Sequence, residues 1–395
     1  MQHFSYLNRL LLTLFAIASL FTTTNLNAQL PTDFADQLVN GSLNQAVGVA
    51  FDANGRMFAW EKGGKVYVFD NSGNIISTLI DIGEEVGNWR DHGMNGFALD
   101  PNFLTNGYFY LYYLVDRHHL MNYGTPSYSS TTNEYYSATI MRVTRYTANS
   151  ATNFTTTVSG SRNVILGATA STGIPCLHES HTVGSLVFGT DGTLLISSGD
   201  GASYSSVDVG SASETYWSQA LADNIIRPEE NVGAFRSQML NSYNGKILRI
   251  DPATGAGISS NPFYDSGNPN SCESKVFSLG LRNPFRCTLR PNSGSTNPAD
   301  ADPGNLYIGD VGWGTWEDLH VTTEAGQNFG WPMFEGLTYH SGYNNSLIVN
   351  EDAPNPLFGT GGCTQEFFYF QDLLKQETPT NSEAINNPCN SGQTI

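Results

Sequence analysis

The stretch that decides the fold reads His181-Thr-Val-Gly-Ser-Leu-Val-Phe-Gly-Thr-Asp-Gly-Thr-Leu-Leu-Ile-Ser-Ser-Gly-Asp200. Two short apolar runs flank Asp191-Gly192, a dipeptide that favours a tight turn between antiparallel strands. If the two runs pair through this turn, His181 and Asp200 return to the same end of one hairpin. A carboxylate beside an imidazole fixes its tautomer and raises its basicity, as a general base requires. Taken alone, the segment also fits an ordinary surface hairpin whose aspartate caps a turn.

The same pattern of an apolar run, a polar turn with glycine and a second apolar run recurs along the chain. Its anchor positions are Phe51, Leu99, Tyr146, Phe188, Ile250 and Leu289. Their intervals are close to the roughly 40–50 residues of one propeller blade. The 40 glycines, 19 tyrosines and 22 phenylalanines fit a turn-rich, aromatic all-β protein. We therefore predict an all-β propeller, with an irregular β-sandwich as the alternative.

The N-terminal residues have the pattern of a secretory signal peptide. Arg9 precedes an apolar run, and Ala28 supplies a small residue at the exit. The run is too short to span a bilayer, and no later run is long enough. We expect residues 1–28 to be removed and residues 29–395 to form a secreted or periplasmic protein without a membrane span. The formal net charge of -18 argues against nucleic acid and anionic membrane surfaces as partners.

Five cysteines are present, and export makes disulfides possible. The local pairings that we expect are Cys272–Cys287 and Cys363–Cys389, with Cys176 left over, although spacing does not fix the connectivity. No pair has the spacing of a zinc or thioredoxin-like motif.

Seven segments between about residues 35 and 336 carry a family resemblance. They begin at Gly64, His92, His181, Gly245, Gly280, Gly309 and Asn328. The two most specific are Gly280-Leu-Arg-Asn-Pro284 and Asn328-Phe-Gly-Trp-Pro332. In this order the segments resemble the glucose/sorbosone dehydrogenase family, soluble quinoprotein sugar dehydrogenases that use pyrroloquinoline quinone (PQQ). The resemblance implies a six-bladed β-propeller with PQQ and Ca²⁺ in a cleft at one face.

The resemblance also assigns roles to individual residues. It implies that His181 is the catalytic base and Asp200 its partner, that Arg282 and Asn283 hold the quinone, and that Asp91 lies near the cofactor. The carbonyls of Gly312 and Trp313 match a calcium-binding loop, and Phe329 and Trp331 match a loop on the sugar side. Structural alternatives remain open at this point. Arg282 could form a salt bridge in a blade turn, and the tryptophans could pack between blades.

The implied chemistry suits these residue types. Oxidation of an aldose at its anomeric carbon removes a hydroxyl proton, which His181 would take, and a hydride, which PQQ would accept. Ca²⁺ and the charge of Arg282 would make the quinone carbonyl more electrophilic. Calcium prefers oxygen ligands, including main-chain carbonyls, and a glycine-rich loop can present them.

The resemblance ends near Gly336, where the family continues with further blades and basic cofactor ligands. We expect the last blade or blades to be truncated or divergent in this sequence. The leading functional prediction is a secreted, PQQ- and calcium-dependent aldose dehydrogenase that makes the lactone. The alternatives are a non-catalytic binding module, like the hedgehog-interacting proteins of the same superfamily, and a calcium-dependent lactonase. The sequence names neither the sugar, the electron acceptor nor the oligomeric state.

Overall fold

The computed structural model describes residues 34–373 and 386–394. The chain divides into a unit before Ser42 and a unit from Ser42 to Ile395, and everything below concerns the second. The predicted signal peptide lies outside the described residues. No helix in the described ranges is both long and apolar enough to cross a membrane.

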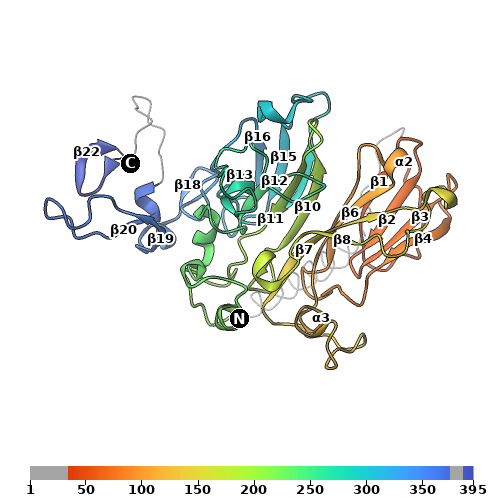
Figure 1. Cartoon of the computed structure of the whole chain (residues 1–395), viewed down its shortest axis with the longest axis horizontal. Helices are drawn as coiled ribbons and strands as arrows, with labels where there is room; N and C mark the ends of the chain where they lie inside the picture. Colours follow the sequence, from red (N-terminus) through yellow and green to blue (C-terminus); the bar gives the residue numbers. More distant parts are fainter. Residues whose placement is uncertain (1–33, 374–385, 395) are drawn as a thin grey trace, which may run out of the picture. The chain divides into compact units, whose positions relative to one another are not determined.

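Four antiparallel sheets of three or more strands follow one another along the chain (Figure 1). The first sheet contains β1 (Ala46–Phe51), β2 (Met57–Glu61), β3 (Lys65–Phe69) and β4 (Ile75–Asp81). The second contains β5 (Met94–Leu99), β6 (Tyr108–Leu114), β7 (Thr139–Thr147), β8 (Asn163–Leu166) and β9 (Ile174–Cys176), of which β9 pairs with β7. The third contains β10 (Val183–Phe188), β11 (Leu194–Ser198), β12 (Lys246–Ile250) and β13 (Val276–Leu279). The fourth contains β14 (Pro284–Leu289), β15 (Leu306–Asp310) and β16 (Asp318–Thr322).

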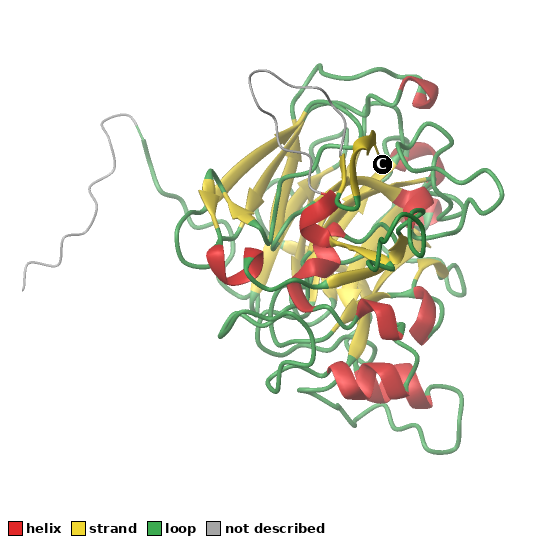
Figure 2. Cartoon of the chain, turned by 90° about the vertical axis from the view of Figure 1, so that its left-hand side faces the viewer, coloured by secondary structure: helices red, strands yellow, loops and turns green. Residues whose placement is uncertain are grey.

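The remaining elements are small. Three two-stranded sheets are formed by β17 (Phe334–Glu335) with β18 (Thr338–Tyr339), β19 (Val349–Pro354) with β20 (Phe367–Tyr369), and β21 (Asn386–Asn387) with β22 (Asn390–Thr394). The α-helices of the described residues are short and lie in connecting loops: α2 (Phe103–Asn106), α3 (Arg117–Asn122), α4 (Trp217–Ala222) and α5 (Ser341–Asn344). Figure 2 shows these short helices in red and the strands in yellow.

The arrangement is propeller-like, because the first strand of each large sheet packs beside the first strand of the next: β1 beside β5, β5 beside β10, and β10 beside β14. The predicted number of blades is wrong for the described residues, which form four such sheets and not six. The number six came from the family resemblance, and the six repeat anchors do not mark six blades either. Tyr146 lies in β7 and Ile250 in β12, which are third strands of sheets already begun by β5 and β10. An apolar run and a glycine turn mark any hairpin of a blade, so the pattern counted two blades twice.

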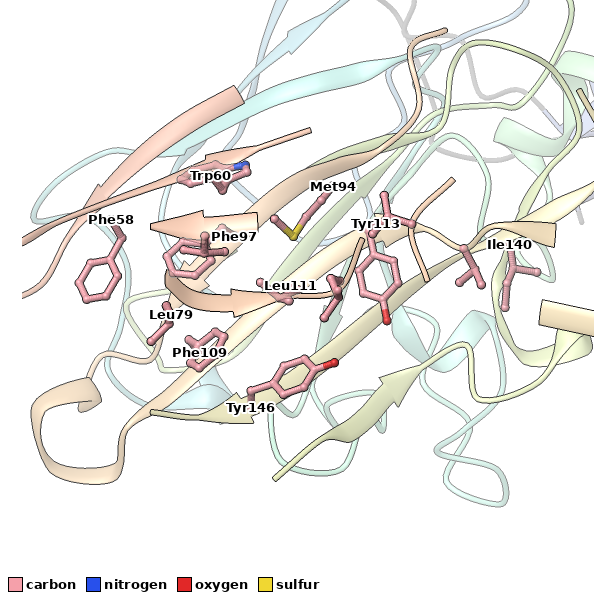
Figure 3. Close-up of a cluster of buried hydrophobic side chains, with 14 of the residues drawn as sticks. Phe58, Trp60, Leu79, Met94, Phe97, Phe109, Leu111, Tyr113, Ile140 and Tyr146 are labelled. Atoms are coloured by element: carbon pink, nitrogen blue, oxygen red, sulfur yellow. The ribbon is translucent and has the colours of Figure 1, made fainter. Parts of the chain in front are cut away.

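The main core lies between the first two sheets. Phe58, Trp60 and Leu79 of the first sheet meet Phe97, Phe109 and Leu111 of the second (Figure 3). Phe58 and Phe97 have ring centroids 6.2 Å apart. Burial of one such side chain stabilises the fold by about 1.5–3 kcal/mol. A smaller cluster between the third and fourth sheets includes Leu195, Ile247 and Ile308, which fixes β15 against the hairpin that carries His181.

The cysteines follow the prediction in part. Cys363 and Cys389 form a disulfide, and Cys176 is free, as expected. The predicted Cys272–Cys287 pair is wrong, since both thiols are free. Cys272 precedes β13 of the third sheet and Cys287 lies within β14 of the fourth. Closeness in sequence therefore does not bring these two cysteines together.

Candidate active site

The hairpin predicted from the sequence forms and brings its two ends together. Strand β10 pairs antiparallel with β11, and Gly192 in the turn between them has a φ of 77°. Nδ1 of His181 lies 2.9 Å from Oδ1 of Asp200. The exposed fractions of these side chains are 4% and 0%. Because Nδ1 is held by the carboxylate, Nε2 is the ring nitrogen left for a substrate.

The backbone at His181 is unusual and is supported by the residues that follow β11. His181 has a φ of 57°, a left-handed conformation that is rare for residues other than glycine. Its carbonyl accepts a hydrogen bond of 3.0 Å from the N–H of Gly201. A Cβ atom on Gly199 would lie 2.3 Å from the same carbonyl oxygen. Glycine at position 199 is therefore required for the close approach that orients His181.

Asp200 is held by three donors. Besides His181, the N–H of Ala202 donates to Oδ1 at 2.9 Å and Nε1 of Trp331 donates to Oδ2 at 2.7 Å. Burial by itself would raise the pKa of Asp200, but His181 and Arg282 together with the Ala202 N–H hold this pKa below its usual value. Asp200 is thus a carboxylate that can stabilise a positive charge on His181.

Arg282 is placed by the loop that follows β15. Oδ2 of Asp310 accepts from the backbone N–H of Arg282 at 3.0 Å, and Oδ1 accepts from that of Asn283 at 2.6 Å. The guanidinium donates through Nη1 to the carbonyls of Val311 and Gly312, both at 2.8 Å. Its Nε is buried without a hydrogen-bond partner within residues 34–373 and 386–394. Arg282 therefore carries a donor that a bound acceptor could satisfy.

His181 and Arg282 line one cavity of about 450 Å³. The other lining residues are Arg90, Asp91, Glu179, Ser180, Tyr204, Val311, Gly312 and Trp313. Of the predicted site residues, Asp91, Gly312 and Trp313 thus share the cavity with His181 and Arg282. Asp91 accepts a hydrogen bond of 2.6 Å from the hydroxyl of Ser180.

Three predicted residues lie elsewhere. Asn283 is largely buried but does not line the cavity. Phe329 packs on His320, with ring centroids 4.5 Å apart. Phe329 and Trp331 border a very small space on another side of Arg282. The structure therefore does not bring Phe329 and Trp331 to the cavity where His181 lies, and it gives Trp331 a contact with Asp200 instead.

One wall of the cavity was not singled out from the sequence. The hydroxyl of Tyr204 donates to Glu179, and Nε of Arg90 lies 3.1 Å from the other oxygen of the same carboxylate. The ring centroid of Tyr204 is 6.4 Å from that of His181. Nε1 of Trp313 donates at 2.5 Å to the carbonyl of Tyr204, which holds this loop in place. Tyr204, Glu179 and Arg90 come from three loops, so no local sequence motif could have joined them.

A buried histidine, which begins one of the segments that resemble the family, lies behind the site. His92 is fully buried, with Nδ1 at 2.7 Å from the hydroxyl of Thr182 and Nε2 at 3.0 Å from the carbonyl of His178. Desolvation lowers the pKa of His92 to about 3, so the ring is neutral. His92 therefore holds both ends of the segment that contains His181. Cys176 and His178, shortly before His181, are buried as well.

The residues present fit the quinone end of PQQ. Besides Arg282, Arg90 is the other cation among the residues that line this cavity, and it already pairs with Glu179. Arg282 has no carboxylate within ion-pair distance in the described part of the chain and has the unsatisfied Nε described above. A quinone oxygen or carboxylate could accept that bond. Gly312, whose carbonyl is a proposed calcium ligand, lines the cavity. This carbonyl already accepts a hydrogen bond from Arg282. No cluster of three His, Cys, Asp or Glu suited to a metal occurs among the described residues.

The fold and the site together define a class: a propeller-like all-β protein with a buried His–Asp pair and an arginine at one polar cavity. The family model described as Glucose / Sorbosone dehydrogenase matches residues 43–360. The chain belongs to this family.

Three relatives illustrate the range of similarity. HIPL1 protein of Arabidopsis thaliana is 24% identical over 79% of this chain and 44% of its own length. Quinoprotein glucose dehydrogenase B of Acinetobacter calcoaceticus is 23% identical over 86% of this chain and 62% of its own length. The structure of the PQQ-bound aldose sugar dehydrogenase of Streptomyces coelicolor superposes with a TM-score of 0.52 at 21% identity, covering 78% of this chain and 68% of that one. The chain thus spans about half to three fifths of the length of these curated relatives.

Proposed function

We propose that this protein is an exported quinoprotein dehydrogenase that oxidises the anomeric hydroxyl of an aldose to the lactone. The observation that carries the proposal is that His181 and Arg282 line the same cavity, with Asp200 bonded to the histidine. Membership of the glucose/sorbosone dehydrogenase family supports the reaction class. The lactone product, the aldose substrate and export remain part of the proposal.

In this proposal, residues of the protein remove the proton of the anomeric hydroxyl. Nε2 of His181 accepts the proton of the anomeric hydroxyl while the C1–O bond gains double-bond character. Nδ1–H donates to Asp200, whose negative charge stabilises the imidazolium that forms. When bound, PQQ supplies the acceptor for the hydride that leaves C1.

Arg282 would hold the quinone end of the cofactor with its guanidinium. Asp91, which lines the cavity, remains a proposed neighbour of the cofactor, whereas Asn283 lies outside the lining; the carbonyls of Gly312 and Trp313 remain the proposed calcium ligands. The Gly312 carbonyl accepts one hydrogen bond from Arg282, and its second lone pair is the one that would be left for calcium.

On the sugar side, Tyr204, Glu179 and Arg90 are better placed than Phe329 to contact substrate, since they line the cavity. A tyrosine ring can pack on the C–H face of a pyranose, while a carboxylate and a guanidinium bond its hydroxyls. We expect Glu179→Gln to raise KM for the sugar more than it lowers kcat.

Reconstitution tests the proposal. The purified full chain is mixed with PQQ and Ca²⁺, aldoses are added, and reduction of a redox dye is followed. We expect dye reduction that depends on PQQ and falls by about 10²- to 10⁴-fold in His181→Ala. His118→Ala is the matched control, because His118 bonds only to its own loop. A folded protein that takes up PQQ but reduces no dye, or takes up no PQQ, contradicts the proposal and favours a binding module.

A further inference from the structure

A cavity larger than the one at His181 lies elsewhere in the described residues. Its volume is about 960 Å³, and it shares no lining residue with the His181 cavity. It lies between the second and third sheets, bordered by the end of β8, the loop that follows α4, and the loop that precedes β13. A volume of this size is within the range of sites for small organic ligands, about 300–1,000 Å³.

One side of the cavity is aliphatic. We call Ile165, Leu166, Ile225 and Ile226 the aliphatic wall; each is less than 9% exposed. Leu221 of α4 extends it. These side chains come from β8 and from the segment after α4. A hydrocarbon chain that covers them would gain free energy in proportion to the apolar area removed from water.

The other side holds a buried cation without an anion. Lys275 is 3% exposed, and its ammonium donates to the hydroxyl of Tyr243 at 3.2 Å and to the carbonyls of Asn270 and Ser271. No carboxylate lies within ion-pair distance of Lys275 in the part of the chain that the structure describes. Desolvation lowers the pKa of Lys275 to about 8, so at neutral pH the group is still largely charged.

Tyr243 lines the cavity and is hydrogen-bonded to Lys275. Its hydroxyl accepts from Lys275, and within the described ranges its own proton has no acceptor. The other cation of the lining, Arg227, lies within ion-pair distance of Asp352, Glu229 and Glu230, so it offers no unpaired positive charge to a ligand. Lys275 and Tyr243 are consequently the part of the lining with an unpaired positive charge and a free donor.

We propose that this cavity binds a single-chain amphiphile with a carboxylate head. The carboxylate accepts the hydroxyl proton of Tyr243 and lies against the ammonium of Lys275. The alkyl chain covers the aliphatic wall. The site is separate from sugar oxidation, and its occupancy does not depend on PQQ.

Calorimetric titration of the full chain with decanoate and with 1-decanol tests the proposal. Both ligands carry the same alkyl chain, and they differ in the charge of the head. We expect decanoate to bind at least about tenfold more tightly than decanol, because a charge-assisted hydrogen bond is replaced by a neutral one. Equal affinities for the two ligands, or no binding of decanoate, would overturn the proposal.

Variants locate the site. Tyr243→Phe removes only the hydroxyl, and Lys275→Met removes the charge. Each should weaken decanoate binding about tenfold or more and weaken decanol binding much less, since decanol makes only a neutral hydrogen bond there. Lys65→Met is the matched control, since it removes a surface lysine paired with Asp81. Ala168→Trp places a large ring on an exposed lining position and should weaken both ligands. If Lys275→Met does not fold, the decanoate affinities of Tyr243→Phe and Ala168→Trp test whether the ligand binds in this cavity. Unchanged decanoate affinity in both places the ligand elsewhere and refutes the site.

Discussion

The indole N–H of Trp331 donates a hydrogen bond of 2.7 Å to Oδ2 of Asp200, on the carboxylate that holds His181. The same ring lies 5.4 Å from the guanidinium carbon of Arg282. Trp331 thus contacts both a residue that orients the proposed base and the residue proposed to hold the quinone. This arrangement makes Trp331 a positioning residue and distinguishes it from a residue that contacts sugar.

The substitution Trp331→Phe distinguishes a positioning role of Trp331 from a role in sugar contact. The change keeps a ring beside Arg282 and removes the donor to Asp200. In the reconstituted enzyme we expect kcat to fall about tenfold, the loss of one hydrogen bond to a charged group, with KM for the sugar nearly unchanged. Trp316→Phe is the control, because that exposed indole donates only to Thr338. A higher KM with unchanged kcat would instead support the sugar-side role that the family resemblance implied.

Gly199→Ala should disturb His181 through its backbone. The new Cβ would lie 2.3 Å from the His181 carbonyl oxygen, and overpacking of this kind costs about 1–3 kcal/mol. Denaturant unfolding and dye reduction measure the two effects, and we expect both stability and kcat to fall. Gly192→Ala is the comparison: it strains the turn, where φ is 77°, but meets open space. If Gly199→Ala keeps full kcat, the backbone of His181 is not fixed by this contact.

The buried, neutral His92 should make the folded protein less stable as the pH falls. In the folded protein its pKa is lowered to about 3, whereas an unfolded histidine titrates near 6.5. The unfolded state therefore binds the proton first, and stability from neutral His92 is complete above about pH 6.5 and declines as pH falls toward 3. Unfolding free energies measured from pH 7 to pH 4 should show a shallower decline in His92→Gln than in the wild type. Parallel pH profiles would contradict this assignment.

The three free cysteines should be unreactive while the protein is folded. Burial raises the pKa of Cys176 to about 12; Cys272 and Cys287 are half-buried, and desolvation raises the pKa of Cys287 to about 12 and that of Cys272 as well. Since the thiolate is the nucleophile, iodoacetamide should label these positions only after denaturation. Peptide mass mapping would also show the Cys363–Cys389 disulfide and no Cys272–Cys287 bond. Labelling of Cys272 in the native protein would contradict the raised pKa of its thiol.

The sequence was most informative where chemistry and local geometry coincide. An Asp191-Gly192 turn between two apolar runs is sufficient to return His181 and Asp200 to one end of a hairpin, so this pair was predictable. Arg282 was predictable from the specificity of its motif. The number of blades was not, because third strands such as β7 and β12 carry the same pattern as first strands.

Contacts between distant loops lay beyond sequence reasoning. Tyr204, Glu179 and Arg90 meet only because three loops converge, and none of them has a distinctive neighbourhood. Trp331 was noticed for its motif, but its direction toward Asp200 depends on how the loop after β16 returns to the third sheet. The uncompensated charge of Lys275 is likewise invisible until burial is known.

The most direct test of the central claim is a crystal structure of the full chain soaked with PQQ and Ca²⁺. The account predicts the quinone in the 450 Å³ cavity, bonded to the guanidinium of Arg282 and facing Nε2 of His181. PQQ bound at another place, or His181 and Arg282 turned to opposite sides of it with no shared contact, would contradict the account.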